Sequence, residues 1–290
     1  MTLSNLLGKA SLGMVLLVSA YTAEATVITF TDFSNTSGLQ INGSASAPVT
    51  DDLGNKVLRL TPALNSQGGS AFSTDTISLD ANASFSSAFQ FRMTDPHTSD
   101  GIGLGADGIA FVVQTVANNV GGIGGGLGYA GINNSVGIEF DTWNNGAIDN
   151  NSSNHVGIDL NGDVNSVTLI PVATDMNNGS IWTAWVDYNG VTDLLEVRLA
   201  EGANASRPGS ALLSDIVDLP TILGATNAFA GFTAATGAAN ENHDILAWQF
   251  NSTYDPIDTI GKGTIPEPSS LALVSIGLLS AAKFGRRKRG

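Results

Sequence analysis

Residues that could bind metal ions gather in the segment 136–160, VGIEFDTWNNGAIDNNSSNHVGIDL. Glu139, Asp141 and Asp149 offer carboxylate oxygens, and His155 offers an imidazole nitrogen. This mixed set of donors suits an octahedral transition ion such as manganese. Amide oxygens, the hard donors that calcium accepts, are supplied by Asn144, Asn145, Asn150, Asn151 and Asn154. The segment therefore predicts a site for divalent cations, in which two metals could share the carboxylates.

The two flanks of this segment have the period of two that is typical of β-strands. Apolar residues at positions 136, 138 and 140 alternate with Glu139 and Asp141, which therefore share a face. Apolar residues at positions 156, 158 and 160 place His155 on the opposite side of a second strand. The pattern predicts a β-hairpin whose connection, residues 142–154, is long enough to be functional or disordered. The alternative is a solvated loop in which Asn and Asp only make the turns.

Short alternating runs such as VITFTDF, FSSAFQFRM and LLEVRLA recur along the chain, and helical periodicity is scarce. Together with 34 glycines in 290 residues, these runs favour an all-β sandwich. The chain has no cysteine, but a single domain over residues 26–255 is long enough to build a substantial core without disulfides.

Three further segments extend the pattern of the metal-binding segment. Ala106-Asp107-Gly108 precedes the strand-like run IAFVVQ, residues 124–128 read GGGLG, and residues 231–250 read GFTAATGAANENHDILAWQF. In this order, the four motifs resemble those of the legume lectin family, also called L-type lectins, over most of residues 26–255. The resemblance implies a concanavalin-like jelly-roll β-sandwich that binds carbohydrate and does not catalyse a reaction.

The resemblance also assigns roles to individual residues. In this family an Asp that follows an unusual cis Ala-Asp bond accepts hydrogen bonds from sugar hydroxyls, and calcium orients an Asn that contacts the same hydroxyls. By position, the expected carbohydrate-binding residues are Asp107, Gly125, Asn145, Ala238 and Ala239. The expected manganese ligands are Glu139, Asp141, Asp149 and His155, and the expected calcium ligands are Asp141, the Trp143 carbonyl, Asn145 and Asp149. Sugar binding is therefore expected to need metal.

The chain departs from the family pattern at the second acid of the loop. The family places this Asp five residues before the His and follows it with Pro, whereas Asp149 lies six residues before His155 and is followed by Asn150. Asn150 stands at the family's spacing. A carboxylate that bridges two dications offsets their mutual repulsion, which a neutral amide cannot do, and this favours Asp149. If Asn150 is the ligand, the transition-metal position is weak or empty.

Two other functions fit parts of the pattern. A glycan hydrolase of related jelly-roll architecture would use Glu139 and Asp141 as paired carboxylates. The further Glu of its motif is missing, because residues 142–144 are Thr, Trp and Asn. A structural or adhesion protein of a matrix would keep the fold and the calcium site and lack sugar affinity. Trp143 and Tyr129 could stack on a sugar ring or pack under their loops.

The charge of the chain limits its partners. Residues 26–265 contain 6 Lys or Arg and 24 Asp or Glu, a net charge of −18. This charge argues against nucleic acid, anionic lipid and acidic polysaccharides as partners. Bound divalent cations would neutralise part of it, so metal-free protein is expected to be less stable.

Both ends of the chain carry targeting signals. Lys9, the apolar residues 12–18 and Ala23-Glu24-Ala25 predict a signal peptide over residues 1–25. Residues 256–264 are interpreted as a linker. Residues 265–290 contain Pro266-Glu267-Pro268, an apolar run that predicts a short transmembrane helix, and a basic end.

This tail resembles the bacterial PEP-CTERM sorting segment. The resemblance implies transient anchoring in the inner membrane, cleavage by an exosortase-type enzyme and release to the surface; the alternative is a permanent single-pass anchor. The sequence as a whole therefore predicts an exported lectin, dependent on Ca²⁺ and Mn²⁺, that binds glycans or exopolysaccharide at the cell surface or in the extracellular matrix. A homodimer is compatible with the family.

Overall fold

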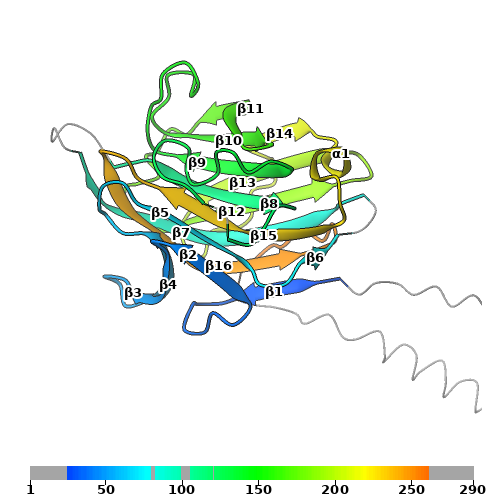
Figure 1. Ribbon diagram of the computed structural model, residues 1–290, viewed down its shortest axis with the longest axis horizontal. Helices are drawn as coiled ribbons and strands as arrows, with labels where there is room; N and C mark the ends of the chain where they lie inside the picture. The colour runs from blue at the N-terminus through cyan, green and yellow to red at the C-terminus, as the bar shows by residue number, and fades with distance from the viewer. Residues whose placement is uncertain (1–24, 80–81, 99–104, 120, 261–290) are drawn as a thin grey trace, which may run out of the picture.

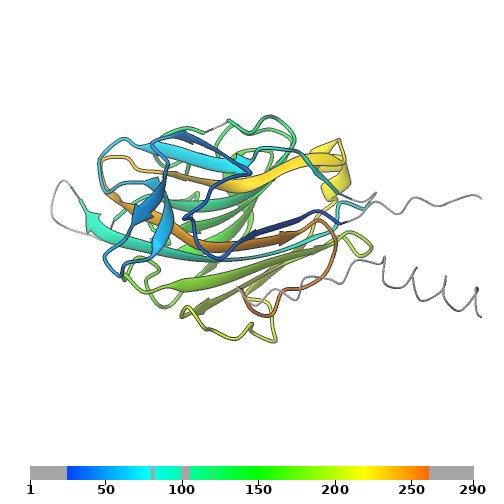
Figure 2. The same ribbon diagram turned by 90° about the horizontal axis from the view of Figure 1, so that it is seen from below.

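The computed structural model describes residues 25–79, 82–98, 105–119 and 121–260. The expected signal peptide, apart from Ala25, and the expected sorting segment lie outside these ranges. Within them, no helix has the length and hydropathy needed to cross a membrane. The described chain forms two antiparallel β-sheets stacked on each other, as Figures 1 and 2 show from two directions.

Sheet A contains eight of the described strands, paired antiparallel. In spatial order they are β14 (Leu213–Ile216), β13 (Leu194–Glu201), β12 (Trp182–Asn189), β7 (Phe85–His97), β16 (Asn240–Asn251), β4 (Lys56–Thr61) and β3 (Ser46–Thr50), while β1 (Val27–Phe30) also pairs with β16. The final strand, β16, therefore lies in the middle of sheet A, between β7 and β4.

Sheet B also contains eight strands. In spatial order they are β11 (Asp163–Pro171), β10 (His155–Leu160), β9 (Ser135–Asp141), β8 (Gly108–Gln114), β15 (Asn227–Ala235), β5 (Gly68–Ser73) and β2 (Leu39–Gly43), while β6 (Ile77–Ser78) pairs with β15. A short helix, α1 (Leu219–Leu223), lies at one end of the sandwich (Figure 1). Asn134, just before β9, donates to the Ile222 carbonyl at 3.3 Å, so α1 marks the end where β9 starts.

Aromatic side chains fill the space between the sheets. Phe89 of sheet A lies 5.6 Å from Phe140 and 5.0 Å from Phe232 of sheet B, measured between ring centroids, and all three rings are fully buried. These rings come from the apolar positions of alternating strands, which is the arrangement expected for two sheets packed face to face. The prediction of an all-β sandwich is confirmed.

Strand β9 is buried on both faces, whereas its alternation predicted one buried face. Residues 121–134 cover the outer side, where a second apolar cluster contains Phe72, Ala110, Val112, Tyr129 and Ile132. The Tyr129 ring lies directly on Gly137, because a Cβ at that position would be 2.9 Å from the ring. Glu139 and Asp141, on the same face as Gly137, are consequently shielded from solvent as well.

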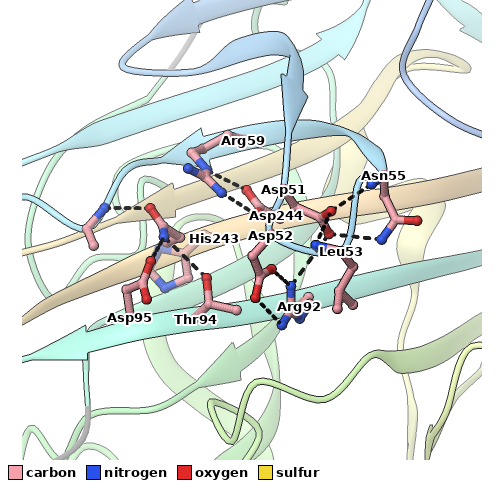
Figure 3. A network of polar contacts seen from close by, with 12 residues as sticks. Asp51, Asp52, Leu53, Asn55, Arg59, Arg92, Thr94, Asp95, His243 and Asp244 are labelled. Atoms are coloured by element: carbon pink, nitrogen blue, oxygen red, sulfur yellow. Dashed lines mark hydrogen bonds and ion pairs between the residues drawn. The ribbon is translucent and has the colours of Figure 1, made fainter.

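The outer face of sheet A carries a network of ion pairs, shown in Figure 3. Arg59 on β4 binds both carboxylate oxygens of Asp244 on β16 at 2.8 Å. Arg92 on β7 binds the carboxylate of Asp52 in the β3–β4 connection, with one N–O distance of 3.1 Å. This network ties β4, β7 and β16 together on the side that faces away from sheet B.

Candidate metal and carbohydrate site

The expected hairpin is present and gathers the predicted metal ligands. β9 and β10 pair antiparallel, with His155 opposite Asp141 and Gly157 opposite Glu139. The three ligand side chains are at most 2% exposed, and one donor atom from each lies within 4.8 Å of the others. His155 Nε2 is 3.2 Å from Glu139 Oε1, while His155 Nδ1 has no partner among the described residues. A single cation could bridge donors this close together.

Asp159 and Ser166, which the sequence analysis did not select, extend this cluster. The Ser166 hydroxyl lies 2.6 Å from Glu139 Oε1 and 2.7 Å from Asp159 Oδ1. Gly157 leaves the space for this contact, because a Cβ there would collide with both Glu139 and Ser166. The alternation of β10 puts Asp159 on the face of His155 and could have identified it. Ser166 becomes a neighbour only through the pairing of β10 with β11.

A cavity of about 60 Å³ adjoins these ligands, lined by Gly125, Glu139, Asp141, Asn145, Ile148, Asp149 and Val164. Asp149 is 4% exposed, and its carboxylate accepts a hydrogen bond from the Asn145 backbone N–H. Asn150 is exposed and has a positive φ of 53°. The structure thus places Asp149, and not Asn150, at the cavity. A water molecule takes up about 30 Å³ in the liquid, so a cation with a water ligand fits there.

Burial makes the negative charge of this cluster costly. Burial, reinforced by Glu139, raises the pKa of Asp141 and of Asp159 well above the ordinary value. Burial also raises the pKa of Asp149. Among the described residues, His155 is the only basic side chain paired with the cluster. A divalent cation would supply the missing positive charge, so the donor set fits the metals that the sequence suggests.

Asp107 is held at the end of β15 and β9 by its backbone. The Ala106-Asp107 peptide bond is cis. The Asp107 N–H donates to the Ala235 carbonyl at 3.0 Å, and its carbonyl accepts from the Thr142 N–H at 3.0 Å. The carboxylate is buried, its Oδ2 has no partner among the described residues, and burial raises the pKa of Asp107 to about 6. A buried acceptor without a partner is suited to receive a donor from a ligand.

Gly125 and Asn145 lie against each other. A Cβ at Gly125 would be 2.7 Å from the Asn145 amide nitrogen, so this amide passes directly over the glycine. The Gly124 N–H donates to the Thr236 carbonyl at 3.2 Å, which brings the glycine-rich loop next to the loop between β15 and β16. Loops far apart in sequence therefore meet at the end of sheet B opposite α1.

Gly125→Ala is expected to weaken carbohydrate binding at least tenfold, because the new Cβ must displace the Asn145 amide, and misplaced binding groups lose much of their contribution. Gly122→Ala is the matched control, since a Cβ there meets nothing within 4 Å. Isothermal titration calorimetry of both variants with sugar measures the two affinities and checks the expectation. Equal affinities for the two variants would contradict it.

The loop between β15 and β16 is short, because β15 ends at Ala235 and β16 begins at Asn240. Ala238 is exposed, Ala239 is buried, and the Ala239 carbonyl accepts from the Gly237 N–H at 3.1 Å. A Cβ at Gly237 would be 3.6 Å from Asp107 Oδ2, so this tight turn lies next to the free carboxylate oxygen.

The two aromatic candidates differ in position. Trp143 is partly exposed, and its backbone N–H donates to Asp141 Oδ1 at 2.6 Å, which ties the backbone of Trp143 to the ligand cluster. Tyr129 is fully buried, with its hydroxyl 3.0 Å from both Ser135 Oγ and the Gly162 nitrogen. Tyr129 therefore packs under its loop, the second of the two roles that the sequence left open.

Comparison with known proteins places this site in a family. A family model for the legume lectin domain matches residues 25–266, and one for the PEP-CTERM protein-sorting motif matches residues 264–289. A bark lectin of Styphnolobium japonicum is 33% identical over 262 residues, 84% of this chain and 92% of that protein. An L-type lectin-domain containing receptor kinase of Arabidopsis thaliana is 34% identical over 222 residues, 74% of this chain and 29% of the kinase.

Solved structures agree with these matches. A lectin from Bauhinia forficata has a TM-score of 0.65 and 28% identity, and the basic winged bean lectin has a TM-score of 0.65 and 27% identity. Each comparison covers 79% of this chain and 98% of the other. The lectin domain is carbohydrate-binding and not an enzyme, and the PEP-CTERM motif indicates an exported protein that is sorted through an exosortase. The chain belongs to the legume lectin family.

Proposed function

We propose that residues 26–255 form a lectin whose carbohydrate site is organised by calcium and a transition ion such as Mn²⁺. The observation that carries this proposal is the buried acidic cluster of Glu139, Asp141 and Asp149, which shares one cavity with Asn145. Without a cation, the cluster would bury several like charges with little compensation. With a bound cation, the acidic cluster and Asn145 would form a single fixed unit.

We assign the ligands as the sequence suggested. Glu139, Asp141, Asp149 and His155 would hold the transition ion, and Asp141, the Trp143 carbonyl, Asn145 and Asp149 would hold calcium. When bound, the dications neutralise the carboxylates and fix the loop. The Asn145 amide then faces the ligand beside Gly125, and the Asp107 carboxylate accepts hydrogen bonds from sugar hydroxyls. Asp159 and Ser166 orient Glu139 through the Ser166 hydroxyl, which lies within hydrogen-bond distance of both carboxylates.

Galactose-type sugars are the first ligands to test. The Bauhinia forficata lectin was solved with GalNAc, and the winged bean acidic lectin, 27% identical with a TM-score of 0.64, with methyl-α-D-galactose. The backbone N–H groups of Ala238 and Ala239 would complete the site, and the exposed Ala238 methyl leaves room for a ring. Mannose and glucose serve as comparison sugars.

The sorting motif supports a proposal for the place of action. We propose that the chain is anchored transiently in the inner membrane, is cut by an exosortase-type enzyme, and then binds glycans or exopolysaccharide at the cell surface or in the extracellular matrix. A homodimer would use an edge of sheet A, where β14 and β3 are the end strands.

The experiment is glycan-array binding by residues 26–262, first with calcium and manganese and then after chelation. Binding that disappears on chelation is the expected result. Binding that survives chelation would move the sugar site away from the metal cluster. Absence of binding under every condition would refute the lectin proposal and leave a structural matrix role.

A further inference from the structure

Two buried titratable residues of β16, Glu241 and His243, have no role in the ligand sets assigned above. Both are 0% exposed. His243 pairs in register with the core residue Met93, and Asp244 pairs with Arg92 of the outer face. By alternation, Glu241 and His243 therefore point to the inside of the sandwich, toward sheet B. A buried acid and a buried imidazole at this place need an explanation beyond packing.

Glu241 reaches across the interior to the carbohydrate site. Its Oε1 accepts a hydrogen bond from the Thr142 hydroxyl at 2.6 Å. Thr142 is the residue between Asp141 and Trp143, and its N–H donates to the Asp107 carbonyl at 3.0 Å. One carboxylate of sheet A thus binds the residue that links the metal loop to the backbone of Asp107.

The same carboxylate also lies against the chain that leads into Asp107. A Cβ at Gly105 would collide with the carboxylate and the Cβ of Glu241, so the Gly105 backbone rests directly on this side chain. Glu241 Oε2 has no hydrogen-bond partner among the described residues. Glu241 therefore contacts two segments that fix the position of Asp107. One is Gly105, which leads into Asp107, and the other is Thr142, which binds the Asp107 carbonyl.

His243 and Thr61 lie beside Glu241. His243 Nε2 is 3.3 Å from Glu241 Oε1, which is within ion-pair distance but is not a hydrogen bond, and His243 Nδ1 is 2.6 Å from the Thr61 hydroxyl. The order of contacts is Thr61, His243, Glu241, Thr142 and the Asp107 carbonyl, and every member of it is at most 4% exposed. Burial is the main cause of the raised pKa of Asp107, and the electrostatic influence of His243 opposes it while that of Glu241 reinforces it, so both groups lie within electrostatic reach of that carboxylate.

We propose that Glu241 is a positioning residue of the carbohydrate site: through Thr142 and Gly105 it fixes the backbone that carries Asp107, and His243 fixes Glu241. The proposal rests on the proposed function of Asp107. Its physical basis is that a ligand-binding group keeps its geometry only when its neighbours are themselves fixed by packing and hydrogen bonds. Sheet A thereby takes part in a site whose other residues lie in sheet B and its loops.

The test compares Glu241→Ala, Thr142→Val and the double variant in metal-saturated protein. Each single change is expected to weaken glycan binding about tenfold, the range typical of residues that act through a network. The double variant is expected to bind no more weakly than Glu241→Ala, because the contact that Thr142→Val removes is already lost in Glu241→Ala. Glu241→Gln, which keeps an oxygen for Thr142, is expected to bind better than Glu241→Ala.

Asp244→Ala is the matched control. Asp244 is also fully buried, and it forms an ion pair with Arg59 in the network on the outer face of sheet A (Figure 3). By its register opposite Arg92 it points away from sheet B, whereas Glu241 and His243 point toward it. This control is expected to lower the melting temperature and leave glycan affinity unchanged. Equal weakening by Asp244→Ala, or additive losses in the double variant, would mean that Glu241 contributes only stability and would overturn the proposal.

Hydrogen exchange separates this proposal from that of the function itself. In Glu241→Ala, the Thr142 and Asp107 amides, which donate to the Asp107 and Ala235 carbonyls, should exchange faster than in Asp244→Ala. If the natural chain binds no glycan, the lectin proposal fails while faster exchange still supports the positioning role. If exchange at these two amides is unchanged, the positioning role is refuted whatever the chain binds.

Discussion

Chelation of divalent cations is expected to lower the melting temperature by about 5 to 10 °C. A ligand present at 100 times its Kd stabilises the folded state by about 2.7 kcal/mol. For a domain of this size, each kcal/mol shifts the melting temperature by about 2 to 4 °C. Differential scanning calorimetry with calcium and manganese, and again with a chelator, measures the effect. An unchanged melt would argue against the metal site.

The stability of the metal-free protein and that of the metal-bound protein should depend on pH with opposite signs. Burial raises the pKa of Asp107 to about 6 and that of Asp141 and Asp159 well above the ordinary value. In the chelated protein, the folded state therefore binds more protons than the unfolded state, and stability falls as pH rises from about 4 through these pKa values. With metal, the ligands must be ionised, so the stabilisation by metal grows with pH. The difference in melting temperature between the metal-bound and the chelated protein should therefore increase from pH 5 to pH 8.

Two neighbouring substitutions identify the loop ligand. Asp149→Asn keeps the shape of the side chain and removes its charge, and is expected to abolish most of the gain in melting temperature on adding metal. Asn150→Gly is the control, because glycine accepts the positive φ of 53° at that position. Loss of the gain in Asn150→Gly alone would show that Asn150 is the ligand.

Asp107→Asn is expected to weaken glycan binding about 100-fold or more. Two hydrogen bonds from sugar hydroxyls to a carboxylate contribute about 1.5 to 3 kcal/mol each, and each 1.4 kcal/mol is a factor of ten in affinity. Asn145→Ala should have a similar effect, because the amide beside Gly125 is lost. Calorimetric titration with the best sugar of the array measures both.

The fold of Asp107→Asn should be unharmed. The neutral amide removes a buried charge whose raised pKa shows that burial is unfavourable, so the chelated variant should melt no lower than the natural chain. Asp75→Asn, at an exposed acid just beyond the end of β5, is the control and should bind normally. Undiminished binding by Asp107→Asn would remove this residue from the site.

Local patterns in the sequence predicted much of this arrangement. The period of two on either side of residues 142–154 was enough to place Glu139, Asp141 and His155 on one face of a hairpin, because strand geometry alone fixes which side chains share a face. The family resemblance, which rests on the order of the motifs, also assigned Asp107 and Gly125 to the sugar site, and these roles stay predictions.

Local sequence patterns could not predict contacts between strands that are far apart in the sequence. Alternation cannot show that residues 121–134 cover β9, which is why both faces of that strand are buried. Glu241 in the run NENHDIL looks like an ordinary strand acid, and its role depends on the packing of β16 against Thr142, 99 residues earlier in the chain. Ser166 likewise depends on the pairing of β10 with β11.

The central position of the last strand has a consequence for the order of folding. β16 lies between β7 and β4, so sheet A cannot close until residues 240–251 are available, and such long-range pairing forms late. Glu241 and the turn at Ala238 and Ala239 arrive with this strand. If the proposed sugar site is correct, a chain that is still crossing the membrane, or one that has lost β16 to a protease, has no complete site, and the ability to bind sugar appears only after β16 has joined sheet A.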